Sequence, residues 1–113
     1  MEIKDKEYTV KFDAGTGRVT VTGILRLMTK DYKPIQDLLD HIARTPPPKL
    51  DVDLCQLKMV NSSGLNTLSR FVLALRGKAG VQVTFHGAKD QVWQAKTLQN
   101  MKSFLPSANV VFH

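Results

Sequence analysis

The stretch 50–75 constrains the fold most strongly, because it joins two different hydrophobic periodicities through a short polar segment. Apolar and polar residues alternate over 50–55, which predicts a strand with one face on a core. After the polar segment 61–64, apolar residues recur at the spacing of one helix face. These residues are Leu65, Leu68, Phe71, Val72 and Leu75. The stretch therefore predicts a buried strand, a short loop and an amphipathic helix.

Three side chains of the polar segment can cap this helix: Asn61, Ser62 and Ser63. Each can accept a hydrogen bond from an amide of the first turn, which is worth roughly 1 kcal/mol. The two hydroxyls then stand at a helix N-terminus, where free N–H groups and the helix dipole favour negative charge such as phosphate. Ordinary capping is the simpler interpretation of the serines, and a phosphate-accepting site is the alternative. Gly77 lies where a left-handed residue would end the helix.

The chain before this stretch predicts a hairpin and a first helix. Apolar residues alternate over 8–12 and 19–21 around the turn-forming segment 13–17, which indicates two antiparallel strands. Gly23 is expected to end the second strand. Asp31 can cap a helix over roughly 32–44, with Pro34 tolerated in its first turn, and the prolines that follow Thr45 end it.

The chain after this stretch predicts a strand over 81–85, a third helix beginning at Lys89 or Asp90, and a last strand over 110–112. The buried stripe of the third helix is expected to contain Val92, Ala95, Leu98 and Met101, with Trp93 at its rim. Strands that alternate with helices after an opening hairpin indicate an α/β domain. We expect a mixed β-sheet with an N-terminal hairpin, parallel central strands and about three packed helices.

Length and composition indicate one cytoplasmic domain spanning 1–113. A chain of 113 residues can bury one core but not two. No apolar run approaches the roughly 20 residues of a membrane helix, and the first ten residues lack an apolar targeting segment. The single Cys55 cannot form an internal disulfide, which agrees with a reducing compartment. Its position at the end of a strand favours a small core residue over a reactive thiol.

The net charge of +6 points to an acidic protein partner more than to nucleic acid. The basic residues are dispersed along the chain, and no aromatic residues alternate with them as in a nucleic-acid surface. His41, His86 and His113 stand at no ligand spacing with Cys55. We therefore expect no metal, no cofactor, no nucleic acid and no membrane insertion.

The polar segment and the strand before it resemble one family motif. The strand ends in Asp53-Leu54, and after six further residues the sequence NSSGL, residues 61–65, opens the helix. This arrangement resembles the STAS domain of bacterial anti-sigma-factor antagonists, in which a D-L strand end leads to a D-S-S-G-L or D-S-T-G-L motif. The resemblance extends more weakly from about Tyr8 to Phe112, and it implies the STAS fold.

The resemblance implies that Ser63 is phosphorylated by a partner anti-sigma factor that is itself a serine kinase, with Ser62 serving mainly as the cap. The unmodified form would bind the kinase and release its sigma factor, and a serine phosphatase would restore that form. Asn61, Gly64 and Leu65 would complete the cap and contact surface, with Gly64 leaving room for the kinase.

Two positions depart from the family pattern, since Asn61 and Arg26 replace acidic residues. Both changes make the docking face more positive. Arg26 either reaches the Ser63 region, where it would hold the phosphate or select an acidic partner, or is a solvated surface residue with no role.

Other functions fit the sequence less well. A nucleophilic Ser62 or Ser63 would need the G-x-S-x-G turn and a following Asp and His, which are missing, so we expect no catalytic residues. The leading hypothesis is a non-enzymatic signalling module, an anti-sigma-factor antagonist switched by serine phosphorylation in a partner-switching pathway. The alternative is a STAS-like scaffold without phosphorylation, such as an accessory subunit of a membrane transport complex.

Overall fold

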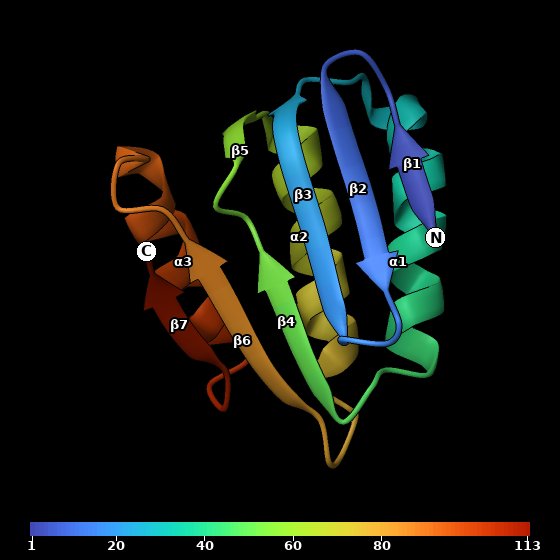
Figure 1. The fold of residues 1–113 in the computed structure, drawn as a ribbon, viewed down its shortest axis with the longest axis vertical. Helices are drawn as coiled ribbons and strands as arrows, with labels where there is room; N and C mark the ends of the chain where they lie inside the picture. The colour runs from blue at the N-terminus through green and yellow to red at the C-terminus, as the bar shows by residue number, and fades with distance from the viewer.

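The structure, a computed structural model, describes residues 1–113. After three opening strands, helices and strands alternate, except that two strands follow one another between the first and second α-helices (Figure 1). In chain order they are β1 (Glu2–Lys4), β2 (Tyr8–Asp13), β3 (Arg18–Leu25), the 3₁₀ helix η1 (Thr29–Tyr32), α1 (Lys33–Arg44), β4 (Lys49–Asp53), β5 (Leu57–Val60), α2 (Ser62–Leu75), β6 (Gln82–Gly87), α3 (Val92–Phe104) and β7 (Asn109–Phe112).

The strands form one mixed sheet of seven strands. The order across the sheet is β1-β2-β3-β4-β6-β7, and β5 pairs with the end of β3 beyond the point where β4 leaves it. The first three strands are antiparallel, whereas β3, β4, β5, β6 and β7 pair in parallel. The expected mixed α/β domain, with an N-terminal hairpin, parallel central strands and three helices, is confirmed.

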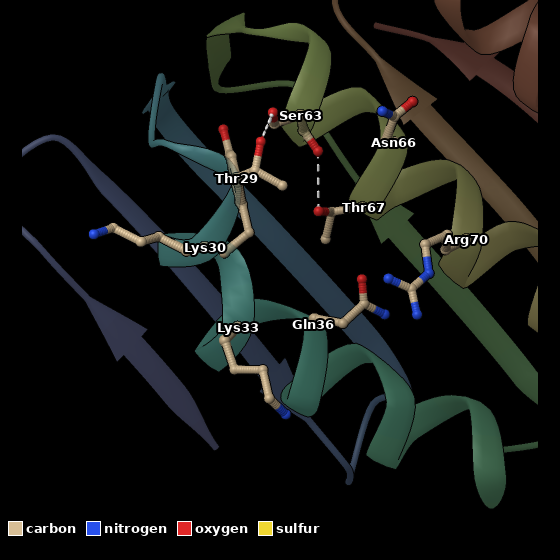
Figure 2. A pocket seen from close by; sticks show the side chains of 9 residues that line it. Thr29, Lys30, Lys33, Gln36, Ser63, Asn66, Thr67 and Arg70 are labelled. Atoms are coloured by element: carbon tan, nitrogen blue, oxygen red, sulfur yellow. Dashed lines mark hydrogen bonds between the residues drawn. The ribbon is translucent and has the colours of Figure 1, made fainter.

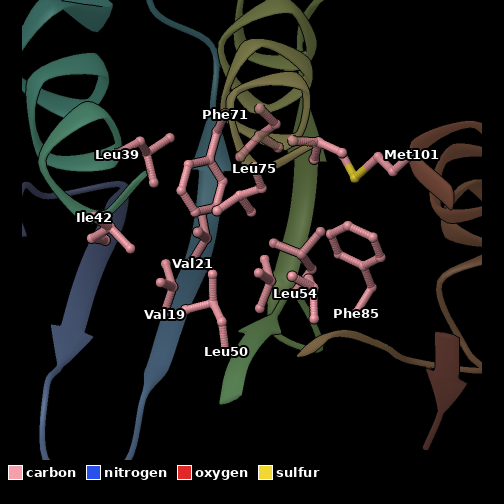
Figure 3. Close-up of a cluster of buried hydrophobic side chains, with 14 of the residues drawn as sticks. Val19, Val21, Leu39, Ile42, Leu50, Leu54, Phe71, Leu75, Phe85 and Met101 are labelled. Carbon is pink, nitrogen blue, oxygen red and sulfur yellow. The ribbon is translucent and has the colours of Figure 1, made fainter. Parts of the chain in front are cut away.

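The core lies between one face of the sheet and the three helices (Figure 3). Alternate residues of the strands point into it, as the period-two pattern predicts: Val10, Phe12, Val19, Val21, Leu50, Val52, Val83 and Phe85. The intervening positions form the opposite face of the sheet, which no helix covers (Figure 1). That face carries Thr9, Thr20, Thr22 and Thr84. None of the helices is long and apolar enough to cross a lipid bilayer.

Two strand predictions are corrected. Gly23 does not end β3, because the strand continues to Leu25 through a register shift at Gly23. Gly23 has φ +89°, and a Cβ there would collide with the Glu7 carbonyl group, so the position requires glycine. The segment after β4 is also more than a loop, because residues 57–60 form the additional strand β5.

Three helix ends differ from the predictions. Helix α1 begins at Lys33, directly after η1, and Asp31 makes no capping hydrogen bond; Pro34 lies in the first turn as expected. Helix α2 ends at Leu75, its C-cap Arg76 has a right-handed conformation, and Gly77 has no positive φ. Helix α3 begins at Val92 without a side-chain cap.

The predicted buried stripe of α3 is half wrong. Leu98 and Met101 are buried as expected, but Val92 is 87% exposed and Ala95 is exposed. Gln94 takes the core position instead. Its amide donates to the carbonyl oxygens of Leu54 and Leu57, at 2.7 and 3.0 Å, and its oxygen accepts from an amide of the β6–α3 loop at 2.8 Å. Burial of this polar side chain is possible because its hydrogen-bonding groups are satisfied.

Candidate functional site

The polar segment lies at the carboxyl edge of the sheet, where the connections from β3 to α1 and from β5 to α2 meet. Asn61 is the N-cap of α2, and its Oδ1 accepts from the Gly64 amide at 2.9 Å. The cap is therefore not Ser62, whose side chain is exposed. Ser63, half-buried in the first turn, pairs its Oγ with Thr29 Oγ1 at 2.7 Å. The Ser63 carbonyl oxygen accepts from Thr67 Oγ1 at 3.0 Å.

Asn61 also fastens the β3–α1 connection to α2. Its Oδ1 accepts a 2.7 Å hydrogen bond from the hydroxyl of Tyr32, which is 3% exposed, and its Nδ2 donates to the Leu27 carbonyl oxygen at 2.8 Å. Burial raises the pKa of the Tyr32 phenol, so Tyr32 remains a donor at neutral pH. The donated bond to Leu27 gives a physical reason for Asn61, because the aspartate of the family motif has no N–H to offer.

Gly64 is buried against this same network. A Cβ at Gly64 would lie 2.5 Å from Val60 Cγ2 and 2.7 Å from Tyr32 Oη. These distances are too short for side-chain contacts, so only glycine fits under the Tyr32 ring without movement. The space beside Gly64 is thus occupied by Tyr32 and Val60. It is not the open approach for a kinase that the sequence suggests.

A cavity of about 380 Å³ opens beside Ser63, between η1 and α1 on one side and α2 on the other (Figure 2). Three of the side chains around it are cationic and none is acidic. The lining residues are Thr29, Lys30, Tyr32, Lys33, Gln36, Ser63, Asn66, Thr67 and Arg70. Sequence reasoning did not identify this cavity, because its cations come from three different elements and form no run in the sequence.

Arg26 and Leu65 lie outside this cavity. Arg26 donates from Nε and Nη2 to the two carboxylate oxygens of Glu7, each at 2.8 Å. This pairing lowers the pKa of Glu7 and leaves Arg26 beside β2 rather than in the cavity. Leu65 is half-buried and borders a groove between α2 and α3. The structure therefore brings Asn61, Ser63 and Gly64 together with Tyr32 and Thr29, but not with Arg26.

Two methionines expose apolar surface next to the polar segment. Met28 immediately precedes Thr29 and is 69% exposed, and Met59 on β5 is 46% exposed. Methionine side chains are flexible and polarizable, and they recur on surfaces that bind proteins. The carboxyl-edge surface, defined here as Met28, Thr29, Met59, Ser62 and Ser63, thus combines apolar contact area with hydroxyl groups.

Cys55, His86 and His113 occupy a separate region. The Cys55 thiol donates to the Gly87 carbonyl oxygen at 3.4 Å, and burial together with the neighbouring Asp53 raises its pKa to about 11. His86 bridges Asp51 and His113, with nitrogen contacts of 2.8 and 2.9 Å. These bonds fasten β4, β6 and the residue after β7 to one another. No three His, Cys, Asp or Glu side chains converge as a metal site.

Neither serine is arranged as a nucleophile. The Ser63 hydroxyl pairs with the hydroxyl of Thr29 and not with a histidine, lysine or carboxylate that could remove its proton. The site can present a hydroxyl to another protein, and its cavity can accommodate negative charge.

Comparison with known proteins finds similar structures but no similar sequences. No family model matches the chain, and no curated protein matches its sequence. A chain of the crystal structure of the diguanylate cyclase SiaD in complex with its activator SiaC from Pseudomonas aeruginosa superposes with a TM-score of 0.74 and 14% identity. The superposition covers 100% of this chain and 99% of that chain. SiaC of Pseudomonas aeruginosa superposes with a TM-score of 0.63 and 16% identity. That superposition covers 99% of this chain and 93% of the SiaC chain.

The chain has a SiaC-like STAS fold. The fold implied by the NSSGL motif and its distance from Asp53-Leu54 is thereby confirmed. Identities of 14% and 16% establish the common fold alone. The roles of individual residues therefore depend on the geometry of this chain.

Proposed function

We propose that this protein is a non-enzymatic regulatory module that binds a protein partner through its carboxyl-edge surface and is switched by phosphorylation of Ser63. The observation that carries the proposal is the position of the Ser63 hydroxyl. It stands in the first turn of α2, lines a cavity with three cationic side chains, and pairs with Thr29, the residue after the exposed Met28. A binding surface of this kind needs no catalytic base.

The structural neighbours support a partner-regulating role. SiaC is described as the activator of the diguanylate cyclase SiaD and is crystallised in complex with it. For this chain, the net charge of +6 and the cations beside Ser63 favour a partner with an acidic docking surface. Within the STAS resemblance, that partner is an anti-sigma factor with serine kinase activity, opposed by a serine phosphatase in the cytoplasm.

The modification has a defined chemistry. The kinase transfers the terminal phosphoryl group of a nucleoside triphosphate to Ser63 Oγ, forming the P–Oγ bond as the bond to the leaving diphosphate breaks. The hydroxyl proton passes to a base of the kinase. The product carries roughly −1.5 to −2 additional charges at neutral pH. An interface formed around a neutral serine would lose affinity, because that charge must be desolvated when the partner binds.

The test begins with protein purified from the cells in which it naturally occurs. Phosphate-affinity electrophoresis and peptide mass spectrometry should reveal a modified species whose phosphate is on Ser63. Ser63→Ala should abolish this species, and Ser62→Ala serves as the matched control that retains it. The unmodified protein should capture the kinase, and the modified protein should not.

Two results would contradict parts of the proposal. Modification confined to Ser62, or persisting in Ser63→Ala, would reject Ser63 as the acceptor. A protein that is never modified, yet captures a partner through this surface, would instead support the scaffold alternative, including an accessory role in a membrane transport complex.

A further inference from the structure

The cavity beside Ser63 is lined by three cationic side chains, only one of which has an ion-pair partner in the protein. Lys30, Lys33 and Arg70 line it without any carboxylate. Lys33 has an ion-pair partner outside the lining, Asp37, at 2.6 Å. Arg70 takes part in none of the four ion pairs of the structure, and neither does Lys30. The cavity therefore retains cationic groups available to an anion.

Arg70 is the cation best placed to serve Ser63. The two residues are seven positions apart on α2, which brings them to nearly the same face, about 10.5 Å apart along the axis. The Cα–Cβ bond of a helical residue tilts towards the helix N-terminus, so a side chain at position 70 can extend back along α2 towards Ser63. Figure 2 shows the Arg70 side chain directed into the cavity towards Gln36, whereas Lys30 points away. A guanidinium is also the group that pairs with two phosphate oxygens at once.

The hydroxyls around Ser63 complete the set of donors. Thr29 Oγ1 is 2.7 Å from Ser63 Oγ, and either oxygen can donate in the unmodified protein. After modification Ser63 has no hydroxyl hydrogen, so Thr29 must be the donor in this contact. Thr67, one turn along α2, lies on the path between Ser63 and Arg70 and lines the same cavity.

We infer that this cavity is a phosphoryl pocket, in which Arg70 and Thr29 hold the phosphate group attached to Ser63. The inference rests on the proposed phosphorylation of Ser63 and adds its consequence within the protein. The modified group is drawn between α1 and α2 and does not project freely into solvent. Arg26, which pairs with Glu7, does not line this pocket.

The test uses full-length protein with phosphoserine inserted at position 63 during translation, so that no kinase is required. Phosphorus NMR then follows the second ionisation of the phosphate, whose pKa is about 6 in an exposed phosphoserine. A neighbouring guanidinium favours the dianion and lowers this pKa. Arg70→Gln should therefore raise the phosphate pKa by about 0.5, and Arg70→Lys should restore part of the difference.

Arg76→Gln, at the far end of the same helix, is the matched control and should leave the phosphate pKa unchanged. If Arg70→Gln behaves like Arg76→Gln while both proteins remain folded, the phosphoryl pocket is rejected. Failure of the proposed function gives a different result: the phosphate of the engineered protein still responds to Arg70, but protein from natural cells carries none.

Discussion

The phenol of Tyr32 donates a 2.7 Å hydrogen bond to Asn61 Oδ1, the same atom that caps α2. This one oxygen thus joins the residue before α1 to the first turn of the helix that carries Ser63. Because Asn61 also donates to the Leu27 carbonyl oxygen, the two connections at the carboxyl edge are held as one unit. The position of Ser63 depends on that unit.

Asn61→Asp should destabilise the protein, although aspartate caps helices as well as asparagine does. The substitution retains the capping oxygen but replaces the amide that donates to Leu27 with a second oxygen. The resulting repulsion between acceptors should lower the free energy of unfolding by about 1–2 kcal/mol. Urea denaturation measures this loss. Ser62→Ala, on the exposed neighbour, should change stability by less than about 0.5 kcal/mol, and equal effects of the two substitutions would contradict the assigned network.

Gly64→Ala should be destabilising even though alanine is about 1 kcal/mol better than glycine within a helix. The added methyl group collides with Val60 and with the Tyr32 hydroxyl, and such overpacking costs about 1–3 kcal/mol. Tyr32→Phe removes the oxygen at 2.7 Å and should recover part of that cost. A double-mutant cycle by urea denaturation measures the coupling. Strictly additive effects would show that the methyl group does not press on Tyr32.

Ser63→Asp should separate binding from stability. A carboxylate is favourable in the first turn of a helix, so the thermal midpoint should stay close to that of the wild type. Affinity for the partner should fall by about tenfold or more, because the charge becomes buried in the interface. Calorimetric titration measures the affinity, with Ser62→Asp as the control for a charge next to the site. Unchanged affinity would remove Ser63 from the interface.

Arg26→Gln should leave stability nearly unchanged, because the Arg26 and Glu7 side chains are exposed and such pairs contribute little. If Arg26 selects an acidic partner, the affinity of the unphosphorylated Arg26→Gln variant for that partner should fall severalfold and depend less on salt concentration. Arg44→Gln, which removes a charge at the C-terminal end of α1, is the matched control. Equal affinity of the two variants would show that Arg26 has no part in docking.

Cys55 should react slowly with disulfide reagents at neutral pH. Burial and the adjacent Asp53 carboxylate raise the thiol pKa to about 11, so the nucleophilic thiolate is scarce below that pH. In the folded protein the reaction rate should rise as the pH approaches 11. In the denatured chain it should already rise at about pH 8.5. Stopped-flow absorbance measures both profiles. Coincident profiles would show that the thiol is not shielded.

The sequence predicted those elements whose periodicity expresses burial directly. Residues 8–12, 19–21 and 50–54 alternate because one side of each strand packs on helices. The short strand β5 escaped detection because only Leu57 is buried, while Lys58 and Met59 face solvent. The stripe of α3 was misassigned for the opposite reason: Gln94 is polar yet completely buried, which its hydrogen bonds with the backbone of Leu54, Leu57 and Ala88 make possible.

The candidate site was predictable only where it is contiguous. Ser63 and its neighbours stand together in the motif, but Tyr32 and Thr29 reach the same place from η1, and Arg70 lies seven residues farther along α2. An aromatic residue before a helix carries no signal for a partner 29 residues later. The NSSGL motif with asparagine in place of aspartate was the only clue, and its meaning required the position of the Leu27 carbonyl oxygen.

The uncovered face of the sheet allows the sequence to diverge there while the fold is retained. With all helices on one side, the residues between the core positions contact water or one another, and natural substitution there meets few steric limits. Homologues should therefore vary freely at Thr9, Thr20, Thr22 and Thr84 while keeping apolar residues at Val10, Val21 and Phe85. A domain that packs helices on only one side of its sheet can change many residues on the other side and retain its fold.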